Sequence, residues 1–108
     1  MMLFVRPTLG KITGFDYNLW SVFRMTRAEA VATLKHTLDQ RLAGNRAPLL
    51  FGLHSDFYSD TWSSPGATGA QRRQAIEELL DYALSHPEVR VVSHAQVLDW
   101  MQRPTQLE

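Results

Sequence analysis

The sequence contains no cysteine, which excludes disulfide bonds, thiolate metal sites and cysteine nucleophiles. It has no excess of charge of either sign, because 11 basic and 11 acidic side chains give a net charge of zero. A neutral chain gives no electrostatic reason to expect nucleic acid or an anionic membrane as a partner. No apolar stretch reaches the length of a membrane span, and the N-terminal residues lack the long apolar centre of a signal peptide. These absences leave the localisation open.

The composition is that of an ordinary globular protein. Of the 108 residues, 44% are hydrophobic and 20% are charged. A chain of this length with no internal repeat and no linker-like segment predicts a single domain over residues 1–108. Residues 1–25 are punctuated by Pro7, Gly10 and Gly14, and this predicts a loop-rich start.

Three capping-box patterns predict the starts of three helices. Each places a Ser or Thr three residues before a Glu or Gln: Thr26 and Glu29, Thr68 and Gln71, Ser93 and Gln96. Leucines and valines follow the first box at helical spacing, which predicts a helix over about 27–43. Pro87 ends the second helix and Pro104 ends the third, since proline cannot continue a helix.

Apolar runs between these helices indicate strands. Pro48 to Leu53 is continuously apolar, as in a strand buried on both faces, and Val89 to Val92 is rich in β-branched residues. Leu3 to Val5 is a possible third strand. The alternation of helix and strand predicts an α/β fold. We expect a partial (β/α) barrel-like βαβα unit, with a small, mostly parallel sheet of about three strands and about three helices.

His54 stands at the end of the predicted strand at 48–53. Ligands of α/β sheets bind at the carboxyl ends of strands, and histidine titrates near neutral pH. The following loop would bring Asp56, Tyr58 and Trp62 near His54, which makes them candidate substrate-binding residues. In the alternative, His54 only caps the strand with a hydrogen bond, Asp56 forms a turn, and the two aromatic residues pack over the sheet.

Other catalytic patterns are missing from the sequence. His36, His86 and His94 show neither HxH nor HExxH spacing, so we expect no metal to be bound by this chain. No serine lies in a G-x-S-x-G turn, and no phosphate-binding loop is present.

Three stretches of the sequence resemble one family. They are GFDYNLW at 14–20, LDQRLAGNRAPLLFGLHSDFYS at 38–59 and RRQAIEELLDYALSHPEVRVVSHAQVLDWMQRP at 72–104. Together they are similar to the C-terminal portion of the catalytic domain of polysaccharide deacetylases, the NodB-homology or carbohydrate esterase family 4 group. The resemblance covers most of residues 14–104 and consists of several moderate matches.

The resemblance implies metal-dependent hydrolysis of N-acetyl groups on N-acetylglucosamine polymers or oligomers. In a complete member, an Asp and two His hold a zinc-like divalent metal, and a late His protonates the departing amine. His54 is the best match to that late histidine, although a strict L-x-H motif would place leucine where this chain has Gly52. Asp16 and Trp20 match the preceding acidic and aromatic motif, which lines the acetyl pocket.

The early motifs of the family are missing from this sequence. There is no TFDD-type motif, no H-x-x-x-H motif and no R-x-P-Y motif, since Thr8 follows Arg6-Pro7. The resemblance therefore implies a carbohydrate substrate in the full-length context and no activity of this chain alone. The alternative is a non-catalytic small α/β module that acts through self-association, for example as a homodimer, or through binding of a partner or glycan.

Overall fold

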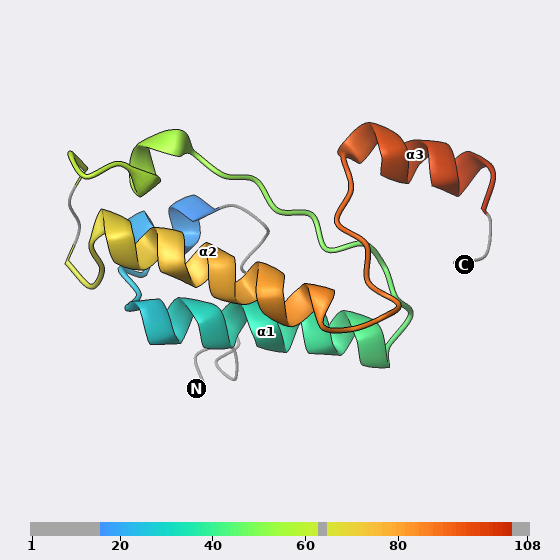
Figure 1. The fold of residues 1–108 in the computed structure, drawn as a ribbon, viewed down its shortest axis with the longest axis horizontal. Coiled ribbons are helices and arrows are strands. Elements are labelled where there is room, and N and C mark those ends of the chain that lie inside the picture. Colours follow the sequence, from blue (N-terminus) through green and yellow to red (C-terminus); the bar gives the residue numbers. More distant parts are fainter. Residues whose placement is uncertain (1–15, 63–64, 105–108) are drawn as a thin grey trace.

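The computed structural model describes residues 16–62 and 65–104 as a set of helices joined by extended segments (Figure 1). Within these ranges no helix is both long and apolar enough to cross a membrane. In chain order the elements are the π-helical turn η3 (Asn18–Val22), α1 (Arg27–Ala43), the 3-10 turn η4 (Ser55–Tyr58), α2 (Gly69–Leu84) and α3 (His94–Gln102).

All three predicted capping boxes are present and set the starts of α1, α2 and α3. In each, the Ser or Thr side chain accepts a hydrogen bond from the backbone three residues on, and the Glu or Gln side chain accepts one in return. Both bonds satisfy N–H groups that a helix start leaves without partners. The predicted helix at 27–43 is confirmed as α1, and α2 and α3 end before Pro87 and Pro104 as predicted.

Helices α1 and α2 lie side by side and form the main packing interface (Figure 1). Val31 and Leu34 of α1 are buried in one cluster with Ala75 and Leu79 of α2, at positions that repeat with the helical period. At the partly exposed edge of the pair, Arg27 in the first turn of α1 forms an ion pair with Glu78 of α2. The two-helix layer is therefore held by an apolar seam with a polar contact at its edge.

The predicted sheet is absent, and the α/β prediction is wrong for the part of the chain that the structure describes. Residues 48–53 and 89–92 are extended, but neither segment forms a strand, and the possible strand at 3–5 lies outside the described residues. A strand needs a neighbour for its ladder of hydrogen bonds. The backbone N–H of Asp16 donates to the carbonyl oxygen of Gly52 at 3.2 Å. Within the described residues, no hydrogen bond joins the segment at 48–53 to the segment at 89–92.

Packing over the helices, and not burial in a sheet, explains why the segment at 48–53 is apolar. Leu49 and Phe51 are partly buried above α1 and α2, whereas Leu50 between them is 53% exposed. The segment therefore buries one side over the helices and leaves the other side open.

A buried arginine fixes the loop between η4 and α2. Arg72 of α2 has no exposed surface, and its guanidinium donates to the carbonyl oxygens of Phe57, Trp62 and Ala67. The guanidinium also lies over the Trp62 ring, 4.7 Å from its centroid. Burial lowers the pKa of Arg72 from its ordinary value, but carbonyl oxygens on several sides compensate for the lost water.

We expect Arg72→Met to lower the free energy of unfolding by about 3 kcal/mol or more, because it leaves three carbonyl groups without their donor. Urea denaturation followed by circular dichroism measures this change. Arg73→Met is the matched control, since Arg73 is exposed and its contacts with Tyr58 and Asp60 lie at the surface. The control should cost less than about 1 kcal/mol. If both variants lost the same free energy of unfolding, the buried hydrogen bonds of Arg72 would contribute no more to stability than the surface contacts of Arg73.

Candidate active site

A fully buried carboxylate stands at the centre of the site. Asp16 lies just before η3 and has no exposed surface. Its Oδ2 accepts hydrogen bonds from the backbone N–H of His54 and the hydroxyl of Tyr58, both at 2.8 Å. Its Oδ1 lies 2.7 Å from Nδ1 of His54. A buried carboxylate is tolerated only when donors replace its water, and Asp16 has three.

His54 is held by one ring nitrogen and open at the other. Because Nδ1 faces the Asp16 carboxylate, the proton belongs on Nδ1 in the neutral ring. The side chain is 55% exposed, and no residue in the described ranges bonds Nε2. The edge of the ring contacts Phe57, with 5.5 Å between ring centroids. The arrangement is an oriented imidazole with one nitrogen free to exchange protons.

Tyr58 connects this pair to the core. Its hydroxyl donates to Asp16 and accepts from Nε1–H of Trp20 at 3.2 Å. Burial raises the pKa of Tyr58 above its ordinary value of 10.0. The Trp20 hydrogen bond opposes this shift, whereas the hydrogen bond and the charge of Asp16 add to it. Tyr58 therefore remains a hydrogen-bond donor to Asp16 throughout the physiological range.

The structure brings four of the six predicted site residues together, namely Asp16, Trp20, His54 and Tyr58. The other two lie apart from this group. Asp56 is exposed on η4, and no hydrogen bond joins it to the four. Trp62 packs edge-on against Phe57, with 4.5 Å between ring centroids, and under Arg72.

Sequence reasoning missed two aromatic residues, one beside His54 and one farther along the same cluster. Phe57 contacts the His54 ring, and the exposed Tyr17 lies near Phe57, with 6.4 Å between ring centroids. The spacing of three residues between His54 and Phe57 was the available signal, because a 3-10 turn brings residues three apart onto one side. Nothing in the sequence pattern marked Tyr17.

The described residues do not fit the metal that the family resemblance implies. Within ranges 16–62 and 65–104, no group of three or more His, Cys, Asp or Glu side chains is placed to hold a metal ion. His36 lies on α1, His94 begins α3, and His86 bonds through Nδ1 to the backbone carbonyl of Tyr82 at 2.9 Å. We therefore derive no step through a metal.

Comparison with known proteins gives no match: no family model, no curated protein and no solved structure is similar to this chain. The relation to polysaccharide deacetylases therefore rests on the sequence stretches quoted above. Any assignment of chemistry rests on the geometry around Asp16.

We predict that stability falls above pH 10, because the folded state raises the pKa of Tyr58 and so keeps a proton that the unfolded chain releases. This contribution is complete below the ordinary pKa of tyrosine and is lost as pH rises through the folded value. Urea denaturation between about pH 8 and 11 measures it. Tyr58→Phe should be less stable at pH 8 but show a shallower loss above pH 10.

Tyr82→Phe is the matched control for this experiment. The pKa of Tyr82 is raised as well, but its main cause is an exposed hydrogen bond to Asp39, whereas burial is the main cause for Tyr58. Removal of the Tyr82 hydroxyl should therefore flatten the pH dependence less than Tyr58→Phe does. The same slope above pH 10 in the wild type and in Tyr58→Phe would show that Tyr58 does not carry the effect.

Proposed function

We propose that Asp16 and His54 form the proton-transfer half of a hydrolase site that acts on N-acetylated carbohydrates, as in polysaccharide deacetylases. The observation that carries the proposal is the 2.7 Å contact between Nδ1 of His54 and the buried Asp16 carboxylate. A carboxylate in this position fixes the tautomer and the ring orientation of a catalytic histidine. The sequence resemblance, which matches His54 to the late histidine of the family, supports the same role.

The chemistry assigned to these residues is one proton transfer. Protonated His54 carries a hydrogen on Nε2 and presents it to solvent, while Asp16 holds Nδ1–H. As the C–N bond of an acetamide breaks, the nitrogen of the departing amine takes the Nε2 proton, and the imidazole becomes neutral. Asp16 does not change protonation in this step. Tyr58 acts as a positioning residue, since its hydroxyl holds the carboxylate that holds His54.

One exposed aromatic side chain near the site is compatible with a carbohydrate as substrate. Tyr17 is exposed and lies near Phe57, whereas Phe57, which contacts His54, is itself buried. Aromatic rings offer flat apolar faces on which sugar rings stack.

Proton donation alone does not hydrolyse an amide, because a nucleophile must also attack the carbonyl carbon. The family resemblance assigns that task to a metal-bound water and a base, for which the described residues offer no ligand group. We therefore predict no release of acetate from N-acetylglucosamine oligomers, with or without added zinc. A colorimetric acetate assay tests this. Zinc-dependent release that His54→Ala abolishes would contradict the prediction and place a complete active site in this chain.

An activated ester tests, without a metal, whether His54 is an accessible and oriented imidazole. p-Nitrophenyl acetate has a leaving group that needs no proton, so an oriented imidazole can promote its hydrolysis. We expect His54→Gln to lower the second-order rate constant by about tenfold or more. His86→Gln is the matched control, because the His86 ring is also held through Nδ1, but by a carbonyl instead of a carboxylate. Equal rates in His54→Gln and wild type would show that His54 is not an accessible, oriented imidazole, and the proposed proton transfer requires one.

A further inference from the structure

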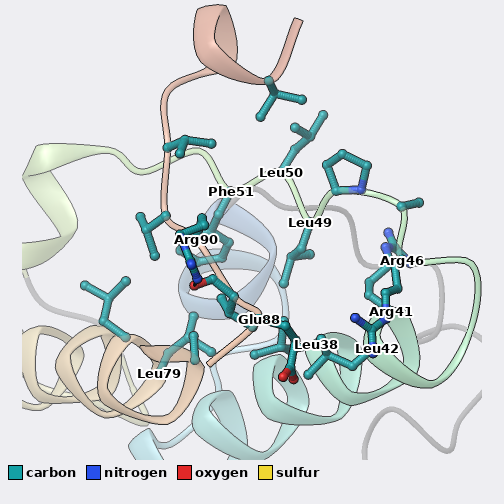
Figure 2. A pocket seen from close by; sticks show the side chains of 18 of the residues that line it. Leu38, Arg41, Leu42, Arg46, Leu49, Leu50, Phe51, Leu79, Glu88 and Arg90 are labelled. Carbon is teal, nitrogen blue, oxygen red and sulfur yellow. Dashed lines mark hydrogen bonds between the residues drawn. The ribbon is translucent and has the colours of Figure 1, made fainter. Parts of the chain in front are cut away.

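An apolar groove lies over α1 and α2, and the two extended segments form its walls. Its volume is about 510 Å³, within the size range of pockets that bind ligands. Figure 2 shows Leu38, Leu49, Phe51 and Leu79 around this space, with Arg41 and Arg46 at one edge. Asp16, His54 and Tyr58 do not line it, so the groove is separate from the candidate active site.

In the part of the chain that the structure describes, several backbone groups in the walls of the groove make no hydrogen bond. No hydrogen bond within the described ranges involves the backbone of Leu49 to Phe51 or of Val91 and Val92. The backbone of a helix is already bonded within the helix, so these wall groups would bond to polar side chains of an occupant or to water. The walls therefore suit an occupant that carries polar side chains beside its apolar ones.

Helix α3 has an apolar surface that the described part of its own chain does not cover. Figure 1 shows α3 set apart from the α1–α2 layer, and none of its residues is buried. Leu98 is 61% exposed and Met101 is 50% exposed. Only His94 and Val97 of α3 line the groove of the same chain. The chain thus presents both an apolar groove and an apolar helix that does not fill it.

The charges of the groove and of α3 are complementary. Arg41, Arg46 and Arg90 line the groove with one acidic residue, Glu88. Within His94–Gln102 the only acidic or basic side chain besides histidine is Asp99. In addition, Nε of Arg41 is buried without a hydrogen-bond partner, which is a costly state that an incoming acceptor would relieve.

We propose that this groove binds helix α3 of a second copy of the chain, so that two copies form a twofold symmetric dimer. In a twofold dimer each α3 packs into the partner's groove, and both copies bury the same surface. Because the net charge is zero, the copies do not repel one another over long distances. The proposal is independent of the proposed function.

Most of the exposed large hydrophobic residues lie where the proposed interface would form. A standard interface takes about 800 Å² from each partner, roughly a tenth of the 7335 Å² of accessible surface here. Nine of the twelve exposed large hydrophobic residues of the described part belong to α2, α3 or the two extended segments. These nine are Leu50, Leu53, Leu80, Leu84, Val91, Val92, Leu98, Trp100 and Met101.

Sedimentation velocity of the full chain at roughly 1 to 200 µM tests the proposal. We expect a reversible dimer of twice the chain mass of 12.3 kDa. Leu98→Glu should raise the dissociation constant by about 100-fold, because it places a charge in the apolar contact. Gln102→Glu adds the same charge at an exposed polar position of α3 and should change the constant by less than about threefold. Since Leu98 is exposed in the single chain, the circular dichroism spectrum should stay helical in both variants.

Two outcomes would overturn the proposal. One is a monomer over the whole concentration range, and the other is a dimer that Leu98→Glu does not weaken. A monomer whose melting temperature rises with sodium dodecanoate would assign the groove to an anionic amphiphile instead. The p-nitrophenyl acetate assay separates this question from the proposed function, because Leu98→Glu leaves Asp16 and His54 in place.

Discussion

The burial of the Asp16 carboxylate is the constraint on which the arrangement of this chain depends. An ionised carboxylate without contact to water needs donors from the protein, and all three come from residues 54 and 58. The segment before α1 is thereby fixed against the segment after it. One carboxylate holds both the backbone N–H and the ring of His54, so it sets the position and the orientation of the same residue. The Asp16 carboxylate therefore both stabilises the fold and orients the candidate catalytic histidine.

The helices could be predicted from the sequence because their signals are local. Each start is defined by two side chains three residues apart, as Thr26 and Glu29 show for α1. The ends follow from Pro87 and Pro104, which act within a few residues. Such signals do not depend on the rest of the fold, and the structure agrees with them.

The absence of a sheet could not be predicted from local signals, because a strand forms only when it pairs with another strand. The apolar run at 48–53 has the composition of a buried strand, but a segment that crosses an apolar groove has the same composition. The candidate active site could be predicted only in part for the same reason. Histidine at a loop junction is a visible signal, whereas its pairing with Asp16 spans 38 residues and follows from no local pattern. The family resemblance singled out Asp16, and the geometry gave the physical reason for its burial.

The long sequence separation within the site affects how the protein folds. Each contact of Asp16 with His54 or Tyr58 closes a loop of 38 or 42 residues that contains all of α1. The entropy of such closure is recovered only after the intervening helix has packed, whereas the capping bonds of a helix close only short loops. We therefore expect mild denaturation to release the histidine from the carboxylate before the helices melt. Loss of the oriented imidazole is then an early sign of loosened tertiary packing, at a stage when the helical content is still nearly complete.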